Sequence, residues 1–398
     1  MKINRHYLDL PENYLFKTVA DKTRAFQVAN PGRSVLKLSI GDVSRPLPVV
    51  VVRAMRQACT EMGQVKTFRG YGDEIGYVWL RESIAKFYKQ QYRVRLEADE
   101  IMISDGAKSD LSNLLDIFDP QATVAMCNPV YPVYLETNLM LGRQPKFFRA
   151  TAENDFLPLP DEKVKADIIY LCNPSNPTGV CYNRAQLQQW VDFARAQHAV
   201  ILYDAAYACF IDDVDLPRSI YEIEGAEQCA IEVGSLSKMA GFTGVRCGYT
   251  IVPKGLQTVD GASLNQLWRR RQATKFNGVS YVVQRGAEAV FTTAGLQAIA
   301  KNIAYYRRNL ALIRSTLQKL NWQYFGGVHA PYVWVRCPHG FSSWQCFDEL
   351  LKKTGIVCTP GVGFGSCGEN YIRLTGFNSY TNTRQACQQL LRLAEMKQ

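Results

Sequence analysis

Short apolar stretches alternate with amphipathic stretches between residue 99 and residue 235 of the chain. The apolar stretches are rich in Ile, Val and Leu and predict buried strands, whereas apolar residues that recur every three or four positions predict helices. The predicted strands are 101–104, 123–127, 166–172, 199–204 and 229–234, and the predicted helices are 109–118, 134–141 and 184–197. Such alternation is typical of an α/β fold in which helices cover both faces of a mostly parallel central sheet.

The pattern changes after residue 280. A long helical pattern at 303–320 precedes an apolar stretch at 331–337 and a glycine-rich segment at 361–368, and together they predict a smaller α+β domain. We expect an N-terminal arm that also forms part of the small domain at 1–47, a large domain at 48–285 and the small C-terminal domain at 286–398.

The composition supports a soluble globular protein. Hydrophobic residues make up 47% and charged residues 21% of the 398 residues, and no apolar run reaches the roughly 18 residues that a membrane span needs. The N-terminal residues lack the continuous apolar core of a signal peptide, so we expect a cytoplasmic location. The 12 cysteines are scattered and are interpreted as free thiols, and the 4 histidines have no metal-ligand spacing, so no metal site is expected.

The net charge of +10 favours anionic partners. The densest basic run, at 268–272, is typical of a solvated helix face, and no nucleic-acid recognition motif accompanies it. We therefore expect small anionic ligands, with no nucleic acid and no membrane as partners.

Three polar loops follow predicted strands: "NPSNPTG" at 173–179, "DAAY" at 204–207 and "SLSK" at 235–238. Each has a purely structural interpretation, as a turn, a helix cap or a surface lysine. Open parallel sheets, however, bind ligands at the carboxyl ends of their strands, where these loops would meet.

In this order the three loops resemble those of the aspartate aminotransferase superfamily, the fold type I pyridoxal 5'-phosphate enzymes. The resemblance implies that Lys238 forms a Schiff base with the cofactor and that Asp204 keeps the cofactor's ring nitrogen protonated. It also implies that Asn176 and Tyr207 hydrogen-bond to the cofactor's phenolic oxygen. A partly desolvated lysine beside other cations has a lowered pKa, which prepares its amine to attack an aldehyde. Lys238, Asp204 and Tyr207 are the expected catalytic residues.

The same resemblance implies a phosphate site and an aromatic wall for the cofactor. A serine-rich turn, a helix N-terminus and an arginine together supply the donors and the positive charge that a phosphate requires. The further cofactor-binding residues that the resemblance implies are Tyr71, Gly106, Ala107, Lys108, Tyr131, Ser235, Ser237, Arg246 and Asn277.

Longer segments are similar to those of the LL-diaminopimelate aminotransferase family within this superfamily. They are "LSIGDVSRPLP", "RGYGDEIGYVWLR", "SDGAKSDL", "DAAYACFI", "SKMAGFTGVRCGY", "FNGVS" and "YIRLTGF". This resemblance implies the interconversion of LL-2,6-diaminopimelate and 2-oxoglutarate with tetrahydrodipicolinate and glutamate, a step in the synthesis of lysine and peptidoglycan precursors. It also implies a homodimer with shared active sites.

Substrate-binding residues follow from the same resemblance. The planar guanidinium of Arg373 is expected to bind the α-carboxylate, and Glu74 is expected near the distal end of the substrate. Glu74, Tyr71 and Asn277 are expected to reach the partner's site. The motif carries Asp73 and Ile75 around Glu74 and has Leu236 where an aromatic residue is common, and these departures concern substrate preference. The other expected substrate-binding residues are Tyr14, Gly41, Lys108, Tyr131, Asn176 and Asn277.

Other interpretations stay open. One is an aspartate, alanine or aromatic aminotransferase of the same fold, or a β-lyase that uses the same cofactor. The other is a non-catalytic cofactor-binding domain of a transcription regulator. We expect this last class to need a separate DNA-binding domain, for which the roughly 45 residues before the first glycine-rich motifs are too few.

Overall fold

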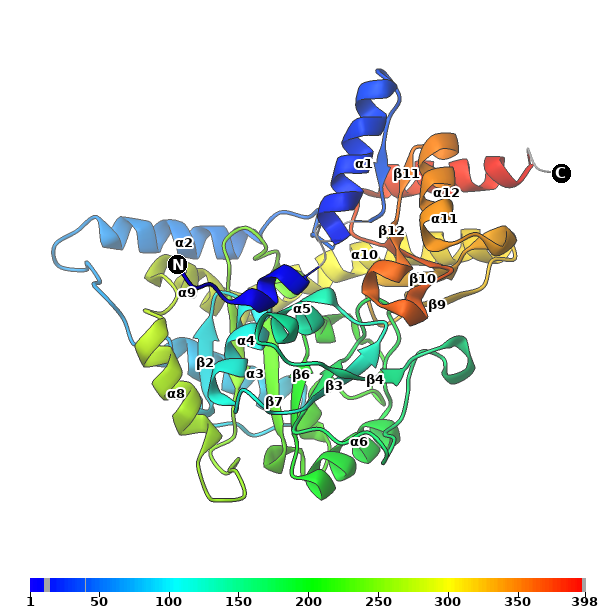
Figure 1. Cartoon of the computed structure of the whole chain (residues 1–398). Helices are drawn as coiled ribbons and strands as arrows, with labels where there is room; N and C mark the ends of the chain where they lie inside the picture. Colours follow the sequence, from blue (N-terminus) through cyan, green and yellow to red (C-terminus); the bar gives the residue numbers. More distant parts are fainter. Residues whose placement is uncertain (11–14, 40, 396–398) are drawn as a thin grey trace.

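The computed structural model describes residues 1–10, 15–39 and 41–395 (Figure 1). The helices are α1 (Leu15–Ala29), α2 (Val49–Met62), α3 (Val78–Gln91), α4 (Ala107–Asn113), α5 (Pro132–Met140), α6 (Arg184–Gln197), α7 (Leu236–Ala240), α8 (Leu264–Lys275), α9 (Tyr281–Val290), α10 (Thr293–Lys319), α11 (Ser343–Thr354) and α12 (Tyr380–Glu395). The strands are β1 (Leu36–Lys37), β2 (Ile101–Ser104), β3 (Val124–Asn128), β4 (Lys146–Arg149), β5 (Ile168–Cys172), β6 (Val200–Asp204), β7 (Ala230–Ser235), β8 (Gly248–Ile251), β9 (Tyr324–Gly326), β10 (Tyr332–Arg336), β11 (Ile356–Val357), β12 (Thr359–Pro360) and β13 (Tyr371–Thr375).

A seven-stranded sheet in the order β2-β8-β7-β6-β5-β3-β4 forms the centre of the molecule. All five strands that the sequence predicts between residues 101 and 234 lie in this sheet, and neighbouring strands from β7 to β4 are parallel. The sequence analysis did not predict β4 or β8. Because β8 runs antiparallel to both β2 and β7, the sheet is mostly parallel, as expected, with one reversed strand.

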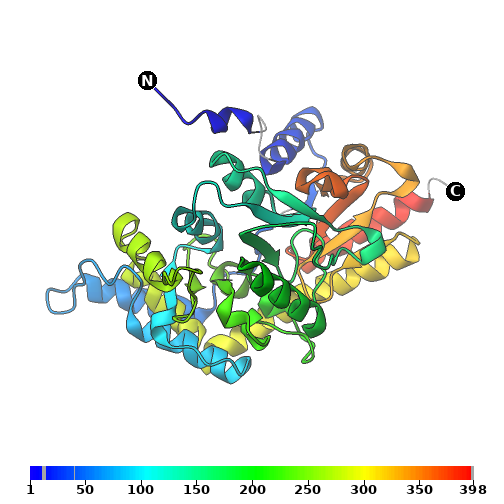
Figure 2. The same ribbon diagram turned by 60° about the horizontal axis from the view of Figure 1, so that its bottom comes forward.

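Helices cover both faces of this sheet (Figures 1 and 2). Alternate residues along the parallel strands point to opposite faces. On one face, Ile169 and Ile201 pack against Trp190 of α6, whereas on the other face Ile168 and Leu202 pack with residues of α4, α5 and α8. The strands are therefore apolar throughout, which explains why the sequence shows continuous apolar stretches.

Helix α6 illustrates how the local sequence sets the bounds of an element. Asn183 and Gln186 form a capping box at its start, and the chain leaves the helix at His198, which has a left-handed backbone (φ 54°). The predicted bounds of 184–197 are confirmed. The predicted helix at 109–118 is less accurate, because α4 begins earlier, after Gly106, and becomes a 3-10 helix from Leu114.

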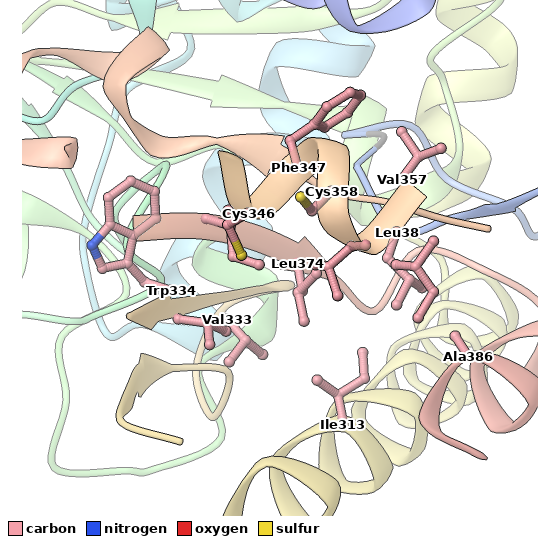
Figure 3. Close-up of a cluster of buried hydrophobic side chains, with 14 of the residues drawn as sticks. Leu38, Ile313, Val333, Trp334, Cys346, Phe347, Val357, Cys358, Leu374 and Ala386 are labelled. Atoms are coloured by element: carbon pink, nitrogen blue, oxygen red, sulfur yellow. The ribbon is translucent and has the colours of Figure 1, made fainter. Parts of the chain in front are cut away.

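A second core lies around the four-stranded antiparallel sheet β12-β13-β10-β9 (Figure 3). Apolar residues of α1, α10, α11 and α12 join it, and β1 pairs with β11. The N-terminal segment therefore packs with the C-terminal part of the chain, as the sequence suggests. The domain boundaries at residues 47 and 285 stay a prediction.

Helix α10 connects the two cores. Ile299 and Ile303 near its start pack with residues beside the central sheet, and Ile313 and Leu317 near its end pack in the second core. Across the described part of the chain, no helix is both long and apolar enough to cross a membrane.

Truncation of a residue in the second core should destabilise the protein. Leu374 on β13 is 1% exposed, and Leu374→Ala should lower the free energy of unfolding by about 2–5 kcal/mol, because it leaves a cavity among packed side chains. Chemical denaturation of the purified protein measures this change. Leu159→Ala is the matched control, since Leu159 is 42% exposed and its truncation should change the free energy of unfolding by less than about 1 kcal/mol. Equal losses in the two variants would contradict the packing described here.

Candidate active site

The three polar loops of the sequence analysis meet at the carboxyl edge of the central sheet. Cys172 at the end of β5 pairs in register with Asp204 at the end of β6, and Ser235 ends β7 two positions beyond the partner of Asp204. A cavity of about 530 Å³ and a neighbouring cavity of about 310 Å³ lie at this edge. They share the lining residues Asp42, Lys108, Tyr131, Asn176, Tyr207 and Lys238.

Lys238 lies on the short helix α7, directly after β7. Its Nζ donates a hydrogen bond to the carbonyl oxygen of Gly41, and burial lowers its pKa to about 8. The negative charge of Asp42 acts in the opposite direction, whereas Arg373 and Arg246 lower the pKa further. About a tenth of the amine is therefore uncharged at pH 7, far more than for an ordinary lysine, and an amine that attacks a carbonyl carbon must be uncharged.

Asp204 is buried at the end of β6. One of its oxygens accepts a hydrogen bond from the hydroxyl of Tyr134, and the other accepts one from the backbone N–H of Ala206 at 3.0 Å. Burial raises the pKa of Asp204, and the hydrogen bonds from Tyr134 and Ala206 counteract this increase. Both donors favour the carboxylate form, which can hold a proton on a nitrogen base that enters the cavity.

Arg246, Ser237 and Gly106 form a cradle at one end of the smaller cavity. Arg246 Nη1 lies 3.3 Å from Ser237 Oγ, and a side-chain carbon at Gly106 would come within 2.5 Å of Arg246 Nη2. Gly106 has φ +134° and precedes α4 without a capping side chain, so the first backbone amides of this helix have no side-chain cap. A cation, serine hydroxyls and backbone amides are a donor set that suits a phosphate group. Ala107, Lys108, Ser235, Ser237, Thr243 and Arg246 line this cavity.

Arg373 lies on β13, lines the larger cavity and is 1% exposed. Its Nη1 donates to Asn176 Oδ1 at 2.6 Å and its Nη2 donates to the carbonyl oxygen of Ser39 at 3.1 Å. Its Nε has no hydrogen-bond partner, and no acid within the described residues forms an ion pair with it. A buried guanidinium without a charged partner is energetically unfavourable until an anion binds, so this position suits a carboxylate.

Most of the residues that the sequence analysis assigned to the site surround these two cavities. Asn176 and Tyr207 lie together, with Asn176 Nδ2 3.4 Å from the Tyr207 hydroxyl. Tyr131 directly precedes α5 and lines both cavities, and Gly41 lines the larger one.

Besides Gly106, which lies beside Arg246 in the cradle, three assigned residues do not line the cavities of their own chain. They are Tyr71 and Glu74, in the loop between α2 and α3, and Asn277, between α8 and α9. Tyr71 is 90% exposed, and the loop projects from one edge of the molecule in both views (Figures 1 and 2). The backbone of Asp73 and Glu74 lies against Gly278, so the two segments are neighbours. Tyr14 lies outside the described residues.

The sequence analysis missed three residues of the site. Asp42 directly follows Gly41 in a quoted motif, and its position beside the lysine could have been inferred from that motif. Tyr134 comes three positions after Tyr131, which places both on one face of a helix, and its hydroxyl proves to bind Asp204. Tyr332 lies in the apolar stretch at 331–337, which was interpreted only as part of the small domain, although it also lines the larger cavity.

The model of the aminotransferase class I and II family matches residues 33–390. The chain is 46% identical to the LL-diaminopimelate aminotransferase of Bacteroides fragilis over 98% of both chains. It is 48% identical to that of Prochlorococcus marinus, over 98% of this chain and 99% of the relative.

Solved structures agree with these relatives. The L,L-diaminopimelate aminotransferase from Chlamydomonas reinhardtii superposes with a TM-score of 0.93 at 37% identity over 99% of each chain. A Thermus thermophilus aspartate aminotransferase variant superposes with a TM-score of 0.87 at 20% identity, over 99% of this chain and all of that chain, and supports the fold alone.

Removal of the Asp42 charge should lower the pKa of Lys238. In the protein without cofactor, the reaction of the Lys238 amine with a small amine-directed reagent should rise with pH around a midpoint of about 8. Asp42→Asn should move this midpoint down by about half a unit, because Asp42 favours the charged amine from a partly solvated position. Peptide mass spectrometry measures the labelling at each pH. Asp260→Asn, at an exposed position, is the control and should leave the midpoint unchanged. A wild-type midpoint near 10.5, or an upward shift in Asp42→Asn, would contradict this account of the site.

Proposed function

Because this chain belongs to the aminotransferase class I and II family, we propose that it is an LL-diaminopimelate aminotransferase that uses pyridoxal 5'-phosphate. It transfers an amino group between LL-2,6-diaminopimelate and 2-oxoglutarate, and the products are tetrahydrodipicolinate and glutamate. The reaction belongs to the synthesis of lysine and peptidoglycan precursors.

The residues around the smaller cavity fit the cofactor. The cradle of Arg246, Ser237 and the start of α4 suits its phosphate, and Asp204 suits its ring nitrogen. The Tyr131 ring lines the same cavity and suits stacking on a pyridine ring. When bound, pyridoxal phosphate supplies an aldehyde that condenses with amines and a protonated ring that withdraws electrons from the substrate's α-carbon.

The protein's residues then have distinct roles. The Lys238 amine would hold the cofactor through its aldehyde carbon. Once displaced by the substrate's amine, Lys238 Nζ would take the proton from the substrate α-carbon and deliver it to the former aldehyde carbon. The Asp204 carboxylate holds the proton on the ring nitrogen throughout. Asn176 and Tyr207 bind the phenolic oxygen, and Arg373 holds the substrate's α-carboxylate and thereby sets which bond faces Lys238.

The single observation that carries this proposal is the placement of Arg373. A buried guanidinium without an acidic partner lines the same cavity as the amine of Lys238. Arg373 suits the α-carboxylate and Lys238 suits the chemistry at the neighbouring carbon, so together they specify an α-amino acid as the substrate.

We further propose that the protein acts as a homodimer in which the loop between α2 and α3 completes the partner's site. This loop carries exposed apolar residues, with Val65 100%, Phe68 61% and Tyr71 90% exposed. Such a cluster on one projecting segment supports a protein contact. Tyr71, Glu74 and Asn277 would then lie beside the partner's cavity, whereas none of them lines the cavity of its own chain.

A donor competition assay tests the proposed reaction. With cofactor and 2-oxoglutarate present, glutamate formation from LL-diaminopimelate should exceed formation from meso-diaminopimelate, aspartate or tyrosine by at least about tenfold in kcat/KM. Lys238→Ala should reduce turnover by a factor of about 10³ or more and remove the visible absorbance of the bound cofactor. Preference for aspartate or tyrosine would indicate a different aminotransferase, and pyruvate release from an amino acid with a β-leaving group would indicate a lyase. Normal turnover in Lys238→Ala would reject the assigned chemistry.

Glu74 should select diaminopimelate from the neighbouring subunit. The distal ammonium of this substrate needs an acceptor, so Glu74→Gln should reduce kcat/KM for LL-diaminopimelate more than about tenfold and affect the glutamate half-reaction much less. A mixed dimer of a Lys238→Ala subunit and a Glu74→Gln subunit locates the contribution. If Glu74 acts across the interface, the site with an intact lysine receives an intact Glu74, and about half of the wild-type activity per dimer should remain. If the mixed dimer is instead no more active than a dimer with Glu74→Gln in both subunits, Glu74 serves the site of its own chain.

A further inference from the structure

Four side chains on the wall of the larger cavity form a network in which each contacts two of the others. The Tyr332 and Tyr207 hydroxyl oxygens are 2.9 Å apart, and the Tyr207 hydroxyl is 3.4 Å from Asn176 Nδ2. Asn176 Oδ1 accepts from Arg373 at 2.6 Å, and the Arg373 guanidinium carbon lies 4.2 Å from the centre of the Tyr332 ring. Each member therefore constrains both of its neighbours.

Among these four side chains, Tyr332 is the one to which the proposed reaction gives no role. It is the first residue of β10, it is 1% exposed, and it lines the larger cavity. Its hydroxyl also lies close to Gly41, where an added side-chain carbon would be 3.0 Å away. The carbonyl oxygen of Gly41 in turn accepts the hydrogen bond from Lys238. A side chain needed only for packing would not require a hydroxyl at this point.

We propose that Tyr332 is a positioning residue, whose hydroxyl directs the Tyr207 hydroxyl toward the cofactor and whose ring holds the Arg373 guanidinium in place for the substrate carboxylate. The inference rests on the proposed function, because it assumes that Tyr207 donates its proton to the cofactor's phenolic oxygen. With that proton committed, the oxygen of Tyr207 can only accept, and Asn176 Nδ2 and the Tyr332 hydroxyl are the donors beside it. The donor in the tyrosine pair is therefore Tyr332.

The ring of Tyr332 performs the second part of the role. Cations bind to the faces of aromatic rings, and a desolvated arginine gains more from this contact than an exposed one. The rings of Tyr332 and Phe364 both lie within 5 Å of the Arg373 guanidinium carbon, at 4.2 and 4.8 Å. They leave the guanidinium in the cavity wall without neutralising its charge, which stays available to a carboxylate.

Two substitutions separate the hydroxyl from the ring. Tyr332→Phe keeps the ring and removes the donor, so the hydrogen bond from Tyr207 to the phenolic oxygen should weaken. The pH midpoint of the cofactor's visible absorbance should then rise by about half to one unit, and kcat should fall about three- to tenfold with KM for glutamate unchanged. Tyr332→Leu also removes the ring and should in addition raise KM for glutamate about fivefold or more.

A double-mutant comparison assigns the shift to Tyr207. In Tyr207→Phe, the further change Tyr332→Phe should leave the absorbance midpoint where Tyr207→Phe alone places it. Tyr371→Phe is the matched control, since its ring stacks on Trp334 outside the two cavities, and it should change neither the midpoint nor KM. The titratable and charged groups around Tyr207 are Asp204, Cys172, Tyr332, Lys238, Asp42, Lys108 and Arg373, and all except Tyr332 are identical between the wild type and the Tyr332 variants.

The outcomes are distinguishable. If the absorbance midpoint and kcat of Tyr332→Phe equal those of the wild type, the role of the hydroxyl is overturned. If KM for glutamate is unchanged in a folded Tyr332→Leu, the role of the aromatic ring is overturned. Because Tyr332→Phe preserves volume, it provides the test even when Tyr332→Leu does not fold. Failure of the wild-type protein to develop visible absorbance with pyridoxal phosphate would overturn the proposed function and this inference with it. Normal wild-type absorbance with unshifted variants would overturn the inference alone.

Discussion

The structure depends on one constraint, which is that charged groups are buried around a cavity that supplies few opposite charges. Arg373 is almost completely buried with two neutral oxygen acceptors and an unpaired Nε, and Lys238 is held in a largely buried position by a backbone carbonyl. Burial of cations in this way costs free energy that the folded chain does not recover by itself. The proposed anionic ligands would recover it, because a carboxylate and a phosphate bring the missing charges.

The fold makes this arrangement possible because two separate cores support the two sides of the cavity. Lys238 and Asp204 are fixed by adjacent strands of the central sheet, whereas Arg373 is fixed by β13 in the second core (Figure 3). Helix α10 packs in both cores and thereby links their positions. The distance between the Lys238 amine and the Arg373 guanidinium is consequently set by the packing of large apolar surfaces and not by a flexible loop.

The sequence predicts the parts of this structure that follow from local patterns or from a resemblance. Continuous apolar strands and capped helices such as α6 are evident from spacing alone, and the residues at the strand ends are evident from their motifs. The reversed strand β8 was not predicted, because its short apolar sequence carries no signal of direction. Tyr134 and Tyr332 were not assigned to the site, because their roles depend on hydroxyl groups that meet partners about 70 and 125 positions away in the chain. The opposite case is given by Tyr71, Glu74 and Asn277. Their motifs assign them to the site, but they do not line the cavities of their own chain.

A crystal structure of Lys238→Ala with pyridoxal phosphate and LL-diaminopimelate would test the central claim most directly, since this variant binds the ligands without turning them over. We expect the cofactor phosphate against Arg246 and Ser237, the ring nitrogen beside Asp204, and the substrate α-carboxylate in contact with the Arg373 guanidinium. A substrate carboxylate bound elsewhere, with Arg373 still bonded only to Asn176 and Ser39, would contradict the claim that the buried guanidinium exists to bind it.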